Sequence, residues 1–339
     1  MVIAYQSSES FSKVCMVSLY SLLINNINDM NLRVYILSKD FSQESLCKIK
    51  GLMSNLGFDP DNARVIDINN LSQRFNLVFD DYNGKWGVDS FCKILLGKLL
   101  PEDEERVLYL DSDTIVTQDL SELYNINLGD YDAAAVKDFL SKQYYDFLNL
   151  SDDSVYVNSG VLLINLNNWR RDKVDEKVSV YLQEKKGMVF FSEQSVLNIV
   201  CKGQIKELDL KYNLTSIPAT LNISEIKDLR NPIKDLDFKQ LEQARKNPVI
   251  IHFTSLFLIC GRAWNIECDH PYKHLFDEYS KHIDEFEETH VSNNQQKLNA
   301  LTKIIPRKLI CKIVGYYYNE IRIRKYKKYC RKRIVNDET

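Results

Sequence analysis

The stretch 107–113, VLYLDSD, decides the fold that we expect, because a short apolar strand ends there in two carboxylates one residue apart. In an extended chain, residues i and i+2 project to the same face, so Asp111 and Asp113 can reach one cation while Ser112 points elsewhere. Hard oxygen ligands suit Mg²⁺ or Mn²⁺. Ligands of open α/β sheets collect beyond the carboxyl ends of the strands, so a nucleotide-sugar transferase is the first hypothesis. The alternative is a solvated turn, in which the same spacing also occurs.

Apolar stretches and helical stretches alternate outward from this strand. We predict strands at 2–5, 33–38, 64–68 and 107–110, and helices at 12–25, 43–56 and 90–100. Further elements follow at 133–136, 156–166, 174–184, 193–200, 249–253 and 273–283. This alternation is typical of an α/β fold, a mostly parallel sheet covered by helices. No internal repeat or low-complexity linker interrupts it, so we predict one domain over residues 1–284.

The composition is that of a globular protein that can bury a full core, with 339 residues of which 45% are hydrophobic. The eight cysteines show no CxxC spacing, and several lie in apolar runs, which favours reduced thiols and no zinc site. The sequence also lacks a signal-peptide pattern and an apolar run of about 18 residues. We therefore expect a cytoplasmic protein.

The C-terminal segment differs from the rest of the chain. Residues 285–297 are polar, and residues 301–339 hold twelve Lys and Arg against three Asp and Glu, in a chain whose net charge is −3. Within 306–329, apolar and aromatic residues recur at near-helical spacing: Leu309, Ile310, Ile313, Tyr316, Tyr317 and Ile321. We predict that residues 285–339 form a polar linker and a basic amphipathic helix on an anionic membrane surface, at its inner face.

Two alternatives for this helix stay open. It can be a solvated or oligomer-packing helix, or it can bind another polyanion. We expect no nucleic-acid partner, because no recognised nucleic-acid motif precedes the segment. The sequence leaves the oligomeric state open.

Several motifs occur in an order that resembles the retaining family 8 glycosyltransferases, which include glycogenin and bacterial lipooligosaccharide galactosyl- and glucosyltransferases. They are YLDSDTIV (109–116), DLSELY (119–124), YVNSGVLLINLNNWR (156–170), SEQSVLN (192–198), KYN (211–213), IIHFTS (250–255) and GRAW (261–264). The resemblance implies a GT-A fold around one continuous sheet. It also implies metal-dependent, retaining transfer of a hexosyl group from a UDP-sugar to a glycan or glycolipid acceptor in cell-surface polysaccharide assembly.

The resemblance assigns the metal ligands. Asp111, Asp113 and His252 match the residues that hold Mn²⁺ in the family, and Mg²⁺ suits the same set. The alternative for His252, which lies in an apolar strand, is a hydrogen-bonded core histidine.

The donor sugar is assigned to two motifs. Asn158 and Ser159 match positions that hold the sugar, although Asn-Ser-Gly is also common in turns. Glu193 and Gln194 match an Asp-Gln pair beneath the sugar ring and are the expected catalytic residues; Ser192 before Glu193 is equally typical of a helix N-terminus. Glu in place of Asp extends the side chain by one methylene, which moves the carboxylate by about 1.5 Å.

The nucleotide end departs further from the family pattern. The family has an acidic residue and an aromatic where this chain has Ser8 and Phe11, preceded by Tyr5 and Gln6. Phe11 can stack on a base, and Ser8 can offer only an uncharged hydrogen bond. Ser112 is assigned to the nucleotide sugar together with Asp111.

Two cations match phosphate-side positions, with their types exchanged. Lys93 replaces an arginine and Arg262 replaces a lysine, which keeps the charge and alters its geometry. The alternative for Lys93 is a helix surface. Because Ser8 and Glu193 depart from the pattern, a binding module without turnover is the alternative function.

Overall fold

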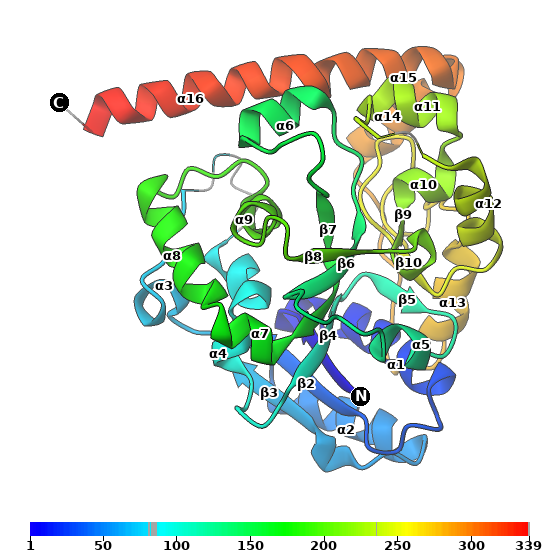
Figure 1. Cartoon of the computed structure of the whole chain (residues 1–339). Coiled ribbons are helices and arrows are strands. Elements are labelled where there is room, and N and C mark those ends of the chain that lie inside the picture. The colour runs from blue at the N-terminus through cyan, green and yellow to red at the C-terminus, as the bar shows by residue number, and fades with distance from the viewer. Residues whose placement is uncertain (81, 83–86, 235, 338–339) are drawn as a thin grey trace.

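The computed structural model describes residues 1–337 except 81, 83–86 and 235. Its centre is a seven-stranded sheet (Figure 1). Of these strands only β7 runs antiparallel to its neighbours. In sheet order the strands are β3 (Ala63–Asp67), β2 (Arg33–Ser38), β1 (Val2–Gln6), β4 (Arg106–Asp111), β7 (Val157–Asn165), β6 (Ala133–Lys137) and β8 (Ile205–Leu208). The mixed, mostly parallel sheet confirms the predicted α/β class.

Side chains that alternate along the central strands divide the core into two layers. On β1, Ile3 and Tyr5 face one layer, while Val2 and Ala4 face the other. The first layer packs on α1 (Ser12–Asn25) and α2 (Gln43–Asn55). The second packs on η3 (Val88–Leu95), α4 (Leu96–Leu99), α7 (Leu166–Arg171), α8 (Val174–Glu184) and α9 (Ser192–Val200). Both faces are covered, which explains the nearly continuous apolar strands.

A separate three-stranded sheet lies beside the large one, where one continuous sheet was expected. Its order is β5-β10-β9, with β5 (Thr114–Val116), β10 (Ile250–His252) and β9 (Leu214–Thr215). The antiparallel pairing of β10 with β5 sets His252 opposite Thr114. This small sheet therefore brings a histidine from late in the chain to the end of β4.

The other described helices are short and connect or flank the two sheets. They are α3 (Leu71–Arg74), α5 (Ser121–Tyr124), α6 (Lys142–Leu148), α10 (Ser216–Thr220), α11 (Ile223–Arg230), α12 (Phe238–Lys246), α13 (Lys273–Ser280), η1 (Glu9–Phe11), η2 (Pro60–Asn62) and η4 (Leu210–Tyr212). The helix predicted at 90–100 is a 3₁₀ helix over Val88–Leu95 followed by α4. All residues from Ser90 to Leu95 are buried, so this segment has no solvent-exposed face. Its sequence therefore lacks the amphipathic period that would distinguish an α-helix from a 3₁₀ helix.

The C-terminal segment is helical and packs on the main body. After α14 (Asn293–Ile304), the elements α15 (Arg307–Tyr316), η5 (a π-helix, Tyr317–Ile321) and α16 (Arg322–Asp337) form one long helix, which crosses the top of Figure 1 above α6. A β-carbon on Gly315 would lie 2.2 Å from the carbonyl oxygen of Asp228, so α15 meets α11 at close range. Ile323 and Tyr326 are buried against Tyr144 and Phe190.

The predicted boundary between residues 284 and 285 stays a prediction, and residues 338–339 of the appendage lie outside the described residues. Among the described helices, none combines the length and the apolar character needed to cross a bilayer.

Candidate functional site

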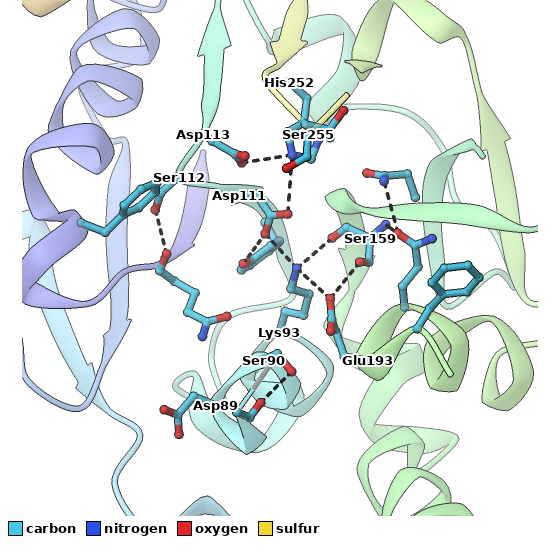
Figure 2. A pocket seen from close by; sticks show the side chains of 18 of the residues that line it. Asp89, Ser90, Lys93, Asp111, Ser112, Asp113, Ser159, Glu193, His252 and Ser255 are labelled. Carbon is cyan, nitrogen blue, oxygen red and sulfur yellow. Dashed lines mark hydrogen bonds and ion pairs between the residues drawn. The ribbon is translucent and has the colours of Figure 1, made fainter. Parts of the chain in front are cut away.

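A cavity of about 620 Å³ opens beyond the carboxyl ends of β1 and β4 (Figure 2). Gln6 at the end of β1 pairs with Asp111 at the end of β4. Because β7 is antiparallel to β4, its first residues reach the same edge, and Val161 pairs with Leu110. Asn158 and Ser159 thus lie within a strand rather than in a turn. The topology gathers three strand ends around one cavity, and its volume suits a small-molecule ligand.

Three potential metal ligands meet at this edge. One ligand atom each from Asp111, Asp113 and His252 lies within 4.8 Å of the others. Ser112 and Asp113 form the turn between β4 and β5, so the two carboxylates converge through a turn and not through the extended chain that we expected. The Ser112 hydroxyl donates to the carbonyl oxygen of Gln6 at 2.7 Å, which holds this turn against β1.

A hydrogen bond on the far side of the ring orients His252. Its Nδ1 lies 3.0 Å from Oδ1 of Asn213, whose Nδ2 donates to Oδ1 of Asn158 at 2.8 Å. An amide oxygen accepts, so Nδ1 carries a proton and Nε2 faces the carboxylates, 3.1 Å from Asp113 Oδ1 and 3.8 Å from Asp111 Oδ2. This is how a second hydrogen bond prepares a metal-binding imidazole. Although only 3% exposed, His252 is therefore more than a core histidine.

The space between the ligands is kept free by a glycine. A β-carbon on Gly160 would lie 2.2 Å from His252 Cε1 and 2.8 Å from Asp111 Oδ2. Two carboxylates and one imidazole around such a space suit a divalent cation that shares its shell with water or phosphate oxygens. The residues present therefore fit a cation such as Mn²⁺ or Mg²⁺.

Lys93 lies between the acidic groups of the cavity (Figure 2). Its Nζ is 2.8 Å from Asp111 Oδ1 and 3.4 Å from Glu193 Oε1, and its side chain is buried, which excludes the helix-surface alternative. Burial alone would lower the pKa of Lys93, but Asp111 and Glu193 outweigh it and raise this pKa, so the ammonium stays charged. Burial likewise acts to raise the pKa of Asp113, yet His252 and Arg262 lower it to about 2.

The pair at the start of α9 is held by hydrogen bonds from β7. Oε1 of Gln194 accepts from Asn158 Nδ2 and from the Ser159 backbone N–H, both at 3.2 Å. Its Nε2 donates to Asp138 Oδ2 at 3.1 Å, while the Ser159 hydroxyl donates to Glu193 at 3.2 Å. Glu193 lies in the first helical turn and also lines the cavity, so both sequence interpretations of this position apply.

The other end of the cavity is lined by Gln6, Ser112, Phe11 and Arg262. Arg262 Nη1 lies 3.2 Å from Asp113 Oδ2, and the Phe11 ring packs edge-on against Trp264 at 4.9 Å between centroids.

Two residues assigned to the nucleotide do not line this cavity. Tyr5 has 0% exposure, because its side chain points into the core beside Ser18. The Ser8 hydroxyl lies 3.0 Å from that of Ser10.

Sequence reasoning missed four residues that complete the site. Tyr109 donates to Asp111 Oδ1 at 2.8 Å, and strand alternation could have revealed it, since it lies two residues before Asp111. Asn213 and Asp138 orient His252 and Gln194. Asp138 follows the carboxyl end of β6, which is a usable signal. Arg322, from α16, lines the cavity without any such signal.

The sequence profile described as glycosyl transferase family 8 matches residues 2–265, the part of the chain that builds both sheets and the cavity up to Arg262. The chain belongs to glycosyl transferase family 8.

This family 8 chain is 29% identical to General stress protein A of Bacillus subtilis over 195 residues, 56% of this chain and 63% of the relative's length. It is 27% identical to lipopolysaccharide 1,2-glucosyltransferase of Escherichia coli K12 over 261 residues, 74% of this chain and 70% of that protein. The crystal structure of the galactosyltransferase LgtC superposes with a TM-score of 0.68 at 21% identity, covering 88% of this chain and 100% of LgtC. The shared fold is the expected GT-A fold.

Proposed function

We propose that this family 8 glycosyltransferase is a metal-dependent, retaining hexosyltransferase that moves a sugar from a UDP-sugar to a glycan or glycolipid acceptor in cell-surface polysaccharide assembly. One observation carries the proposal: the potential cation site of Asp111, Asp113 and His252 shares its cavity with Glu193 and Gln194. The similarity to a lipopolysaccharide glucosyltransferase and to LgtC supports the substrate class.

The nucleotide end of the cavity has groups for a diphosphate and a base. A cation bound by Asp111, Asp113 and His252 would supply Lewis acidity toward phosphate oxygens. Arg262 adds a guanidinium beside Asp113, where it can bind phosphate oxygens through its planar fork. Phe11 offers a ring for stacking on the base.

The sugar end favours electrostatic support over covalent catalysis. Glu193 forms an ion pair with the Lys93 ammonium at 3.4 Å. Because this cation stabilises the negative charge of the carboxylate, Glu193 is a weak nucleophile. The Gln194 carbonyl is oriented by two donors from β7. In our proposal these groups stabilise positive charge on the sugar, while the acceptor hydroxyl attacks on the face that the diphosphate leaves and gives its proton to a diphosphate oxygen.

Slow release of UDP without an acceptor tests this proposal. Purified protein with Mn²⁺ and UDP-glucose or UDP-galactose should release UDP, and EDTA should stop the release. Asp113→Asn removes one cation ligand and should abolish release, whereas Asp103→Asn, at an exposed position, should leave it unchanged. Tight UDP binding with no turnover for any donor or acceptor tried would replace the proposal with the binding-module alternative.

We also propose that the protein is cytoplasmic and binds the inner face of the membrane through α14 and α15. On α15, Leu309, Ile313 and Tyr316 recur every three to four residues, and 50%, 59% and 58% of their surfaces are exposed. Exposed Lys308 and Lys312 accompany this row. A similar exposed row on α14 consists of Leu298, Leu301 and Ile304. An exposed apolar row flanked by lysines is typical of a helix that lies on anionic lipid.

A point variant tests this surface without removing buried side chains such as Cys311. Ile313→Glu should strongly reduce pelleting of the full chain with phosphatidylglycerol vesicles. Val180→Glu is the matched control, because Val180 is similarly exposed at 54% and lies on α8, and it should pellet like wild type. Equal pelleting of Ile313→Glu and wild type would rule this surface out.

A further inference from the structure

The C-terminal segment lies outside the family-matched region 2–265, yet it contributes one side chain to the cavity wall. Arg322, the first residue of α16, has its guanidinium carbon 4.9 Å from the ring centroid of Phe190 and 4.8 Å from that of Phe191. A third ring, Tyr318, lies 5.4 Å away. Phe190 and Phe191 directly precede α9, so Arg322 lies at the sugar end of the cavity, near Glu193 and Gln194.

Arg322 differs from the other cations of the cavity in its partners. Lys93 is paired with Asp111 and Glu193, and Arg262 is paired with Asp113. Arg322 makes no ion pair with any residue that the structure describes, and its neighbours are aromatic faces. The Tyr144 hydroxyl is a hydrogen-bond partner of Arg322. Rings hold the plane of a guanidinium, and its five N–H donors exceed what this one hydroxyl can take up, so N–H groups remain that can donate to a ligand. The sugar end thus presents an uncompensated positive charge.

Packing on both sides fixes this position. Tyr326, one turn further along α16, is 2% exposed among aromatic residues of the body. The Tyr144 hydroxyl of α6 donates to the Tyr318 carbonyl at 2.6 Å. The π-helix η5 ends directly before Arg322, and one extra residue in a turn rotates the side chains of the next helical segment by about 100°. Arg324 points to solvent instead, with 70% of its side chain exposed and an ion pair to Glu320.

We propose that Arg322 forms the anion-binding part of the acceptor subsite, so that the preferred acceptor carries an oxyanion, a phosphate or a carboxylate, near its reacting hydroxyl. That this subsite binds the acceptor rests on the proposed function. Arg262 and the cation site already provide positive groups for the donor diphosphate. Arg322 comes from a separate helix, α16, and reaches the cavity near Glu193 and Gln194. Planar guanidinium donors bind phosphate and carboxylate through paired hydrogen bonds.

Binding of matched sugars to the full-length protein, with UDP and Mn²⁺ present at saturation, tests the proposal. Glucose, glucose 6-phosphate and glucuronate differ in the anionic group, and their affinities can be measured by calorimetry or ligand-observed NMR. Wild type should bind at least one anionic sugar about tenfold more tightly than glucose, which corresponds to one charge-assisted bidentate contact of about 1.4 kcal/mol. Preference for the phosphate or for the carboxylate identifies the group.

Three variants separate recognition from a structural role of Arg322. Arg322→Gln should bring the ratio of anionic to neutral affinity close to one, Arg322→Lys should keep part of it, and Arg324→Gln should match wild type. A purely structural role would weaken all three sugars alike and leave their ratio unchanged. The proposal is overturned if wild type shows no anionic preference or if the preference survives Arg322→Gln. Release of UDP by wild type without sugar reports separately on the proposed function.

Discussion

Gly160→Ala should disable the cation site without replacing any of its ligand residues. The added β-carbon would lie 2.2 Å from His252 Cε1, where carbon atoms normally approach to about 3.5 Å. The imidazole would have to move by more than about 1 Å, whereas metal sites tolerate about 0.2 Å in ligand distances. Strand β7 cannot yield instead, because it is paired with β4 and β6 on its two sides.

The expected loss has two parts. Removal of a group that supports a metal ligand weakens metal binding by about tenfold to a hundredfold. Displacing one of the three protein ligands should weaken Mn²⁺ binding by at least this much. Overpacking should lower the free energy of unfolding by about 1–3 kcal/mol.

Free Mn²⁺, measured by electron paramagnetic resonance during a titration, gives the affinity, and urea unfolding gives the stability. Gly51→Ala is the matched control, since Gly51 lies in α2 and its new β-carbon would meet nothing within 4 Å. The control should be neutral toward Mn²⁺ and more stable by up to about 1 kcal/mol. If Gly160→Ala binds Mn²⁺ as wild type does, the assignment of Asp111, Asp113 and His252 as one cation site is refuted.

Three further changes test the charges and the tail. Lys93→Met leaves the carboxylates of Asp111 and Glu193 without their ammonium, and urea unfolding should show a loss of about 3 kcal/mol; an unchanged midpoint would contradict the buried pairing. The pKa of Asp113 is lowered from 3.8 to about 2, so the unfolded chain binds more protons between these values and the stability contributed by Asp113 is lost as pH falls through this window. Wild type should therefore lose more stability than Asp113→Asn between pH 4 and pH 2, and equal losses would contradict a lowered pKa of Asp113 in the folded protein. Gly315→Val should separate α15 from the Asp228 carbonyl and speed tryptic cleavage within 307–337, whereas an unchanged cleavage rate would show that this contact is dispensable.

Local patterns predicted most elements that form the large sheet. The stretch 107–113 was identified as a strand that ends in two carboxylates, and β4 ends at Asp111. The convergence of Asp111 and Asp113 had a different cause from the one expected, because a turn, and not an extended chain, brings them together. Of the three-stranded sheet, only β10 was predicted, within the apolar strand at 249–253. Strands β5 and β9 escaped prediction because three and two residues are too short to show a period.

The C-terminal helix shows the same division. Its spacing of apolar and basic residues predicted a helix, and α15 to α16 is one. Periodicity alone did not separate buried Ile310 from exposed Leu309, nor Arg322 at the cavity from Arg324 in solvent. The π-helix at Tyr317–Ile321 changes the helical register between α15 and α16. Its position depends on the packing of this long helix against α6 and α11.

The sequence by itself determined the alternation of strands and helices that builds most of the large sheet, the chemical types gathered in each motif and the charge of the tail, because each of these depends on residues close together in the chain. Only the tertiary structure decided that His252 faces Asp113, that Lys93 lies between two carboxylates, and that Arg322 enters the cavity. Each of these contacts joins residues far apart in the chain. Their distances are set by strand pairing and by close packing of side chains, which residue spacing does not encode.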